Sequence, residues 1–175
     1  MPKPLAMNSR ATGFTLVELM IALAIVAILV GLAAPSYRDF THNNQTSATN
    51  NDLVTALNLA RNESLRRSTD VTVCSTPDGV ACGAAGDWKS GWIVFEDDAA
   101  SGVIASAAKV IQKWSGAQGE IQVVTTSQYI QYQPTGLVTN AAKIDVSYAA
   151  CHGLNHRQIQ VSPVGTISTQ LLACP

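Results

Sequence analysis

The most pronounced hydrophobic pattern in the chain is an almost unbroken apolar run near its amino terminus. From Phe14 to Ala34, 21 residues follow one another with Glu18 as the only ionisable side chain. As an α-helix this run is about 30 Å long, which matches the hydrocarbon core of a bilayer. The pattern therefore predicts one transmembrane helix over residues 14–34.

A weaker, periodic pattern follows the apolar run. Residues 35–69 are predicted to continue the helix in amphipathic form, because small and apolar residues recur at helical spacing, namely Leu53, Leu57, Ala60 and Ser64. A narrow stripe of this kind suits packing along a sheet. Residues 41–52 are rich in Asn, Thr, Ser and Gln, which are weak helix formers. We therefore expect that stretch to be partly irregular.

From Asp70 onward the pattern changes to short runs of β-branched and aromatic residues separated by turn signals. Strands are predicted at residues 71–74, 91–96, 109–114, 121–126, 129–133, 143–148 and 158–162. The second strand is apolar on both faces, so we expect it to be covered on both sides. Proline and glycine indicate two similar hairpin turns, at 134–136 and 163–165. The predicted fold class is α+β, with a long N-terminal helix packed against an antiparallel β-sheet.

The residues before the apolar run carry positive charge, from Lys3, Arg10 and the amino terminus. Positive residues before a membrane span hold that end of the chain in the cytoplasm. Residues 70–175 are therefore expected to form an exported, β-rich globular domain.

The position of Gly13 predicts an unusual processing site. A secretory signal places small residues after its apolar region, whereas Gly13 lies before it. Cleavage after Gly13 would remove residues 1–13, keep the helix and leave a free α-amine on Phe14. A carboxylate within a membrane costs on the order of 2.5–3.5 kcal/mol at mid-span and less near the interface. Unless Glu18 lies shallow enough to reach water, it is expected to have a cationic partner inside the membrane.

The segment Gly13-Phe14-Thr15-Leu16-Val17-Glu18 and the apolar run after it resemble the leader and processing site of type IV pilins and type II secretion pseudopilins. The resemblance implies that a prepilin peptidase cuts between Gly13 and Phe14 and N-methylates Phe14. It also implies that Glu18 pairs with the amine of a neighbouring subunit during filament assembly. Gly31 and Pro35 match positions where the helices of related pilins loosen, and proline by itself predicts a kink near residues 32–35.

Composition narrows the classes of function. The chain has 11 basic and 12 acidic residues, and loss of Lys3 and Arg10 with the leader would leave a net charge near −3. Such a balance does not indicate the clustered positive surface that nucleic-acid binding requires. No set of nucleophile, base and orienting residue stands out, so we expect neither enzymatic activity nor a cofactor.

Four cysteines indicate an oxidising compartment outside the inner membrane. Three pairings are possible. We favour Cys74 with Cys82, closing a short loop, and Cys151 with Cys174, tying the last strand to the domain. A crossed arrangement stays open.

Two groups of residues have the composition of metal ligands. Cys151, His152 and His156 are suitably spaced, but Cys151 is better used in a disulfide. Residues 96–98 are Glu-Asp-Asp and could bind calcium, but too few other ligands lie near them. We interpret this run as an acidic hairpin tip, and no metal site is expected.

Three later segments narrow the resemblance. Residues 87–95, 132–136 and 159–165, with a late Cys174, are similar in order and type to the GspH/FimT family of minor pilins and pseudopilins. The resemblance implies a low-abundance type IV pilin that helps to initiate or prime pilus assembly. Its implied partners are other pilins, the prepilin peptidase and the inner-membrane assembly platform. The implied location is a single inner-membrane span with a cytoplasmic amino terminus and a periplasmic domain, later incorporated in a filament.

Two alternatives stay open. A type II secretion pseudopilin of the GspH type would share the same processing and membrane chemistry. Some members of the family bind DNA through arginines near a C-terminal glycine–arginine turn, but here Thr166 follows Gly165 and residues 158–175 contain no Lys or Arg. The nearby basic groups are small, consisting of Arg157 with its neighbouring histidines and, on the helix, Arg61, Arg66 and Arg67. DNA capture is therefore the less favoured alternative.

Overall fold

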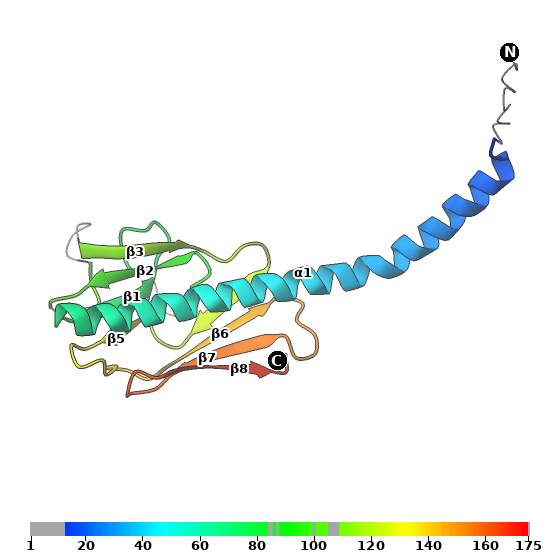
Figure 1. Cartoon of the computed structure of the whole chain (residues 1–175). Helices are drawn as coiled ribbons and strands as arrows, with labels where there is room; N and C mark the ends of the chain where they lie inside the picture. Colours follow the sequence, from blue (N-terminus) through cyan, green and yellow to red (C-terminus); the bar gives the residue numbers. More distant parts are fainter. Residues whose placement is uncertain (1–12, 84–85, 87, 100, 105–108, 175) are drawn as a thin grey trace, which may run out of the picture. The chain divides into compact units, whose positions relative to one another are not determined.

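The computed structural model describes residues 13–83, 86, 88–99, 101–104 and 109–174, except for the side chains of residues 34 and 35. The chain forms two compact units, Met1–Asp39 and Phe40–Pro175. Helix α1 (Leu16–Arg67) passes from the first unit into the second (Figure 1). Apart from Gly13, the predicted leader lies outside the described residues.

The first part of α1 is helical across Gly31 and Pro35. Gly31 has open space around it, since a Cβ built there would meet no other atom within 4 Å. The side chain of Pro35 lies outside the described ones, so the kink near residues 32–35 stays a prediction.

The second part of α1 buries the stripe that the periodicity predicts. Its small and apolar members are fully buried, namely Leu53, Ala56, Leu57, Ala60 and Ser64. The polar residues between them face solvent, including Asn51, Thr55, Asn58 and Asn62. The amphipathic continuation of the helix is therefore present.

Residues 41–52 are helical throughout, so the expectation of an irregular stretch there is wrong. The hydroxyls of Thr46 and Ser47 donate to the carbonyl oxygens four residues earlier, each at 2.8 Å. Thr46, Thr49 and Asn50 are also buried. Tertiary packing and these local hydrogen bonds outweigh the weak helix propensity of the segment.

The first sheet has four antiparallel strands in the order β3-β2-β1-β5. Their bounds are β1 (Val71–Ser75), β2 (Gly91–Glu96), β3 (Val110–Ser115) and β5 (Tyr129–Tyr132). Val73 of β1 lies opposite Val94 of β2 and Ile130 of β5. β2 is buried on both faces, as its apolar sequence predicts, because Ile93 and Phe95 pack in a second, smaller cluster with Cys74.

The second sheet has four antiparallel strands in the order β4-β6-β7-β8. Their bounds are β4 (Ile121–Thr125), β6 (Ala142–Tyr148), β7 (His156–Val161) and β8 (Ile167–Leu172). Ile144, Val146 and Tyr148 of β6 are buried on one face, as the alternation predicts. Most strands begin or end one or two residues away from the predicted positions. The strands form two sheets, whereas the sequence analysis expected one.

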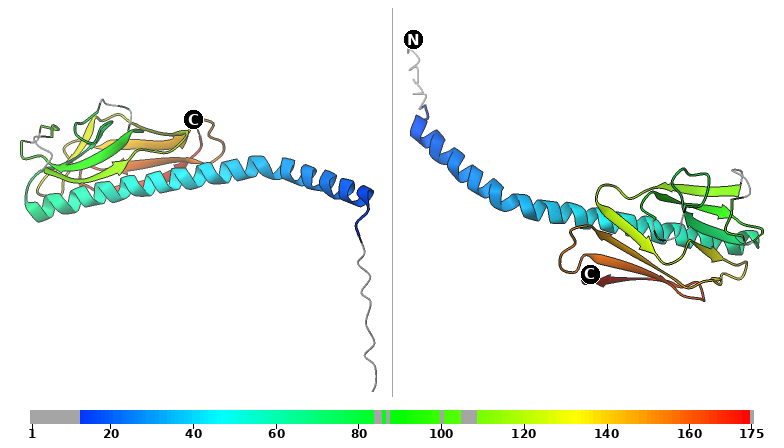
Figure 2. Two further views of the ribbon diagram at one scale, coloured as in Figure 1. Left: turned by 90° about the horizontal axis from the view of Figure 1, so that it is seen from above. Right: turned by 180° about the vertical axis from the view of Figure 1, so that it is seen from behind.

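One hydrophobic core joins the two sheets and the second part of α1. It contains the helix stripe, the inward residues of both sheets and the fully buried Trp88, Trp92 and Tyr132. The two views of Figure 2 show residues 40–67 of α1 running along the sheets. Because every member of this core lies between Leu53 and Val161, the second unit carries its own core.

Two disulfides link the ends of strands to neighbouring loops. Cys74 of β1 pairs with Cys82, and Cys151 pairs with Cys174, with Cα atoms 5.6 Å apart in both cases. These are the pairings favoured from the sequence.

The two proline–glycine turns have the same geometry and lie against each other. In each, the glycine N–H donates to the carbonyl three residues earlier, at 2.8 Å for Gly136 and 2.9 Å for Gly165. Both glycines have positive φ, at 77° and 76°, as the last position of a three-residue hairpin loop requires. Val138 N–H donates to the Pro163 carbonyl at 2.9 Å, which joins one turn to the other.

Gly165 is predicted to be far less replaceable than Gly153. A Cβ on Gly165 would lie 2.2 Å from the Gly136 carbonyl oxygen, whereas nothing lies within 4 Å of one on Gly153, whose φ is also positive. Gly165→Ala is expected to lower the free energy of unfolding by roughly 2–5 kcal/mol. Gly153→Ala, the control, is expected to lower it by about 1–2 kcal/mol. Urea unfolding followed by tryptophan fluorescence measures both, and equal losses would contradict the steric argument.

Candidate functional site

The start of α1 leaves the predicted cleavage bond outside the helix. Thr15 caps the helix, because its Oγ1 accepts a hydrogen bond from the Glu18 N–H and its carbonyl oxygen accepts one from the Leu19 N–H, both at 3.2 Å. Gly13 and Phe14 precede this cap and are exposed. The bond between them therefore lies in accessible, non-helical chain, as the bond cleaved by a peptidase must.

The apolar side chains that follow are covered by nothing in the described structure. Phe14, Leu16 and Leu32 are 84%, 73% and 71% exposed. The most apolar 18-residue window of α1 has a mean hydropathy of 2.8, and none of it is buried. By length and composition this segment can cross a membrane. A segment of this kind requires lipid or other apolar helices around it.

Glu18 is the one ionisable residue of this segment. It is exposed in the first turn of α1, where a carboxylate interacts favourably with the helix dipole. Within the residues that the structure describes, its carboxylate has no hydrogen-bond or ion-pair partner. The arrangement can therefore accept a cation from another molecule.

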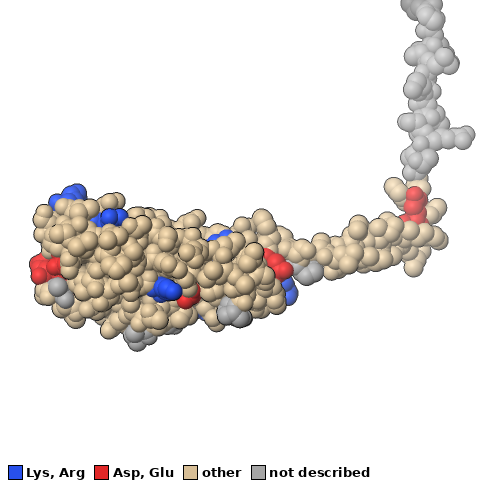
Figure 3. Space-filling model, turned by 90° about the horizontal axis from the view of Figure 1, so that it is seen from below, with Lys and Arg blue, Asp and Glu red and all other residues tan. Residues whose placement is uncertain are grey.

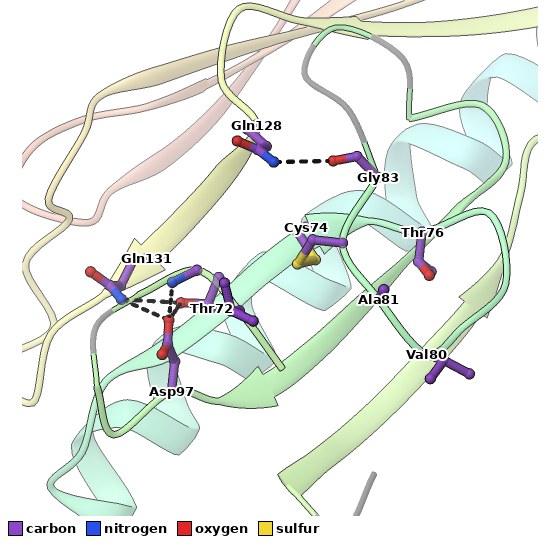
Figure 4. The surroundings of a disulfide bond; sticks show 12 residues. Thr72, Cys74, Thr76, Val80, Ala81, Gly83, Asp97, Gln128 and Gln131 are labelled. Atoms are coloured by element: carbon purple, nitrogen blue, oxygen red, sulfur yellow. Dashed lines mark hydrogen bonds between the residues drawn. A yellow bond between two sulfur atoms is a disulfide. The ribbon is translucent and has the colours of Figure 1, made fainter. Parts of the chain in front are cut away.

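The acidic run at the end of β2 has a structural role that sequence analysis misjudged. Asp97 is 3% exposed rather than at a solvated hairpin tip. Its Oδ2 accepts hydrogen bonds from Gly102 N–H at 2.7 Å, Thr72 Oγ1 at 3.0 Å and Gln131 Nε2 at 3.1 Å (Figure 4). Its Oδ1 accepts two more from Ser101. This carboxylate joins three segments of the first sheet and is already saturated with donors.

The two flanking carboxylates are paired as well. Glu96 accepts a hydrogen bond from Arg67 at 3.2 Å, and Asp98 forms an ion pair with Lys109. The hairpin-tip interpretation is therefore wrong for Asp97, which is buried, whereas Asp98 is exposed in the turn after β2. No group of three or more His, Cys, Asp or Glu residues in the described structure is arranged to hold a metal ion.

The arginines that could have formed a nucleic-acid surface are engaged within the chain. Arg66 and Arg67 both bind Glu63 at 2.5 Å, and their guanidinium groups hold the pKa of Glu63 below its usual value. Arg157 donates to Asn43 Oδ1 at 3.0 Å, and burial lowers its pKa. Figure 3 shows one face of the molecule, where basic side chains occur in small, separate groups.

Arg61 has a position that no sequence signal indicated. Its Nη2 donates to the Val164 carbonyl at 3.4 Å, and its Nε lies close to Gly136 and Gly165. Arg61 therefore packs over the junction of the two proline–glycine turns. The contact spans 103 residues of sequence, so only the folded structure brings its members together.

Cys151, His152 and His156 do not form a common site, because each has different surroundings. Cys151 is in a disulfide, and the His156 ring nitrogen Nε2 lies 2.8 Å from Asp145 Oδ1. His152 is exposed. His42, on α1, stacks on Tyr148 with ring centroids 4.9 Å apart, a contact that sequence analysis also missed.

Sequence comparisons match both parts of the chain. The family described as type II transport protein GspH matches residues 49–165, and the prokaryotic N-terminal methylation motif matches residues 8–34. The type IV major pilin PilE1 of Neisseria gonorrhoeae is 54% identical over 41 residues, 23% of this chain and 25% of that protein. A fimbrial protein of Pseudomonas aeruginosa is 37% identical over 65 residues, 37% of this chain and 42% of that protein. The chain thus matches only about a quarter of the length of the gonococcal relative.

Among solved structures, the type IV minor pilin FimU of Pseudomonas aeruginosa has the same fold. The TM-score is 0.59 at 18% sequence identity, over 75% of this chain and 92% of that one. A second crystal form of FimU gives a TM-score of 0.55. At such low identity the likeness concerns the fold alone.

Asp97 and Asp98 are predicted to differ sharply in their effect on stability. Asp97→Asn is expected to lower the free energy of unfolding by roughly 1.5–3 kcal/mol, because it removes charge-assisted hydrogen bonds and turns an amide N–H toward other donors. Asp98→Asn is the matched control and removes only an exposed ion pair, worth about 0–1 kcal/mol. Urea midpoints of the two variants measure the difference. A loss for Asp98→Asn as large as that for Asp97→Asn would contradict the assignment.

Proposed function

The chain belongs to the GspH family, and on that premise we propose that it is a minor, low-abundance type IV pilin that helps to initiate or prime assembly of the pilus. The methylation motif at residues 8–34 and the FimU-like fold support a membrane-anchored, filament-forming subunit. The proposal is one of assembly rather than of catalysis.

The observation that carries the proposal is the uncovered apolar segment with a single carboxylate in its first turn. The segment is fully exposed in the chain by itself, while the second unit has its own core. Residues 14–33 therefore contribute nothing to the hydrophobic core of the described structure. Their apolar side chains would instead be buried between molecules, first in lipid and then among the helices of other subunits.

The sequence of events follows from charge and position. The positive residues of the leader hold the amino terminus in the cytoplasm, and the second unit is exported to the periplasm. A prepilin peptidase then cleaves the exposed Gly13–Phe14 bond and methylates the new amine of Phe14. The product is a subunit that carries both an ammonium group and a carboxylate at the end of an apolar helix.

Pairing between Glu18 and the Phe14 amine of a neighbouring subunit would set the axial register of the helices. In a medium of low dielectric constant, a buried charge without its partner destabilises an assembly by about 3–5 kcal/mol. A helix shifted along its neighbour would leave both charges unpaired. The inner-membrane assembly platform would then add only correctly registered subunits, and the apolar side chains would supply the packing.

The alternative is a type II secretion pseudopilin of the GspH type. The description of the matching family favours it, and the processing and pairing chemistry would be the same. A strain that lacks the chain separates the two functions. Loss of surface pili with normal secretion indicates the pilus, and loss of secretion with normal pili indicates the pseudopilus.

Gly13→Ala is predicted to block processing. The side chain at the cleavage position would be enlarged, so the chain would keep its leader and migrate as the heavier precursor. Asn8→Ala lies in the same leader and is the control, with normal cleavage expected. Immunoblotting and intact mass of membrane-extracted protein measure the outcome. Mature-sized protein from Gly13→Ala would refute the processing site.

Glu18→Gln and Glu18→Ala are predicted to be cleaved normally but to enter filaments at least roughly tenfold less than the unaltered chain, since each removes the charge that the amine requires. Glu18→Asp keeps the charge and is expected to retain part of the incorporation. The measurement is the amount of the chain in sheared filaments relative to the membrane fraction. Unchanged incorporation of Glu18→Gln would show that packing alone drives assembly.

A further inference from the structure

The two sheets have four outer edges, and three of them are protected against pairing with another strand. Two edges are covered by the chain itself. At β5, Thr139 N–H donates to the Gln131 carbonyl at 3.1 Å, and Tyr132 forms a bridge with Val138. At β4, Trp88 N–H donates to the Val123 carbonyl at 2.9 Å. These loop segments occupy hydrogen-bonding positions that an incoming strand would need.

The third edge, β3, is protected by charge and irregularity. Lys113 is exposed within the strand, and the pairing of β3 with β2 shifts register between Val94 and Phe95. Exposed lysines and bulges on an edge strand are the usual means by which proteins prevent edge-to-edge pairing.

The fourth edge, β8, has none of these features. It is the last strand of its sheet, and residues 158–175 contain no charged side chain. The strand itself, Ile167–Leu172, contains no proline. Within the described ranges, no loop donates to or accepts from the outer edge of Ile167–Leu172.

The register of β7 and β8 identifies the backbone groups that face outward. Ser162 N–H donates to the Thr166 carbonyl, which makes these two residues a hydrogen-bonded pair. In an antiparallel ladder every second pair is hydrogen-bonded, so Gln160 with Ser168 is the next such pair. The N–H and C=O groups of the intervening β8 residues therefore point away from β7, at Ile167, Thr169 and Leu171. Their spacing of two residues is the pattern that a further β-strand pairs with.

The side chains of the same residues show that the sheet is unfinished at this edge. Thr169 lies opposite the fully buried Ile159 and so shares its inward face, but Thr169 is exposed. Leu171 is on that face as well and is 53% exposed. An added strand would cover both and extend the inward face of the sheet.

From this edge we propose that β8 binds an extended strand of a neighbouring pilin-type subunit, which continues the second sheet by β-addition. The inference rests on the proposed function, because it places the partner in the same filament. It adds a contact between exported domains to the contact between helices.

The partner strand is not β8 of a second copy. In the second unit, β8 runs along α1 in the opposite direction (Figures 1 and 2). Antiparallel pairing of two β8 strands would place the amino-terminal ends of the two 40–67 helix segments at opposite ends of the joined sheet, although both chains would have to lead from there into one membrane. Parallel pairing would place the two α1 segments on opposite faces of the joined sheet, so that they could not enter the same helix bundle. A different strand, from another subunit, meets neither obstacle.

A groove beside β8 indicates what the partner's side chains are like. It has a volume of about 460 Å³ and crosses the ends of β6, β7 and β8, where Lys143, Gln160 and Ser168 form one row. Its lining is rich in hydroxyls and holds one ammonium group. The partner strand is therefore expected to present polar or acidic side chains to this face and apolar ones to the side of Leu171.

The test uses the full chain in cells, with a photo-crosslinking phenylalanine derivative in place of Leu171. We expect a crosslink to another pilin-type subunit, identified by mass spectrometry of the joined peptides. Thr169→Pro removes an outward N–H, which the fold does not use, and is expected to lower the crosslink yield roughly tenfold. Thr169→Ala keeps the N–H and is the matched control, with little change expected.

Three results would overturn the inference: no crosslink, a crosslink only between copies of this chain, or equal yields from Thr169→Pro and Thr169→Ala. If Thr169→Pro does not accumulate, hydrogen exchange of the unaltered chain decides. The amides of Ile167, Thr169 and Leu171 are expected to exchange quickly in detergent-solubilised chain and slowly in filaments. Rapid exchange in filaments that contain the chain would refute the strand pairing and leave the proposed function intact. Absence of the chain from filaments would refute both.

Discussion

The structure depends on one constraint, which is that its amino-terminal helix exposes an apolar surface and a carboxylate that the chain itself does not cover. Water is a poor environment for the surface, and lipid is a poor environment for the charge. Only a medium that is both apolar and supplied with cations satisfies both. On the proposed function, a bundle of processed pilin-type helices would be such a medium, because each would contribute an apolar surface and one ammonium group. On the same proposal, the Glu18 carboxylate would make single subunits unfavourable and registered bundles favourable.

The second unit is built in the opposite way. Its hydrophobic core is formed within the unit, by the stripe on α1, the inward residues of both sheets and the buried tryptophans. Even its buried carboxylate, Asp97, is satisfied by Thr72, Gln131 and the backbone of its own loop. Because α1 contributes to this core from Leu53 onward, the helix cannot slide relative to the sheets.

Sequence predicts those features whose physical cause is local. The apolar run and the strand alternation both depend on neighbours within a few residues, and the chain pattern shows them directly. The features that sequence analysis missed depend on distant partners. Residues 41–52 form a helix because Thr46, Thr49 and Asn50 become buried, and the role of Asp97 depends on Gln131, 34 residues away. The division into two sheets likewise follows from pairings such as that of β1 with β5, which no local pattern encodes.

The open edge of β8 adds what helix pairing alone does not provide. The proposed ion pair at Glu18 would fix how far one helix lies along another, but apolar helices of similar sequence pack with many partners. Strand addition at β8 fixes which face of the domain meets a neighbour, and the polar row at Lys143, Gln160 and Ser168 restricts which strand fits. On the two proposals together, pairing at Glu18 would set the axial register of a subunit, and strand addition at β8 would select its neighbour.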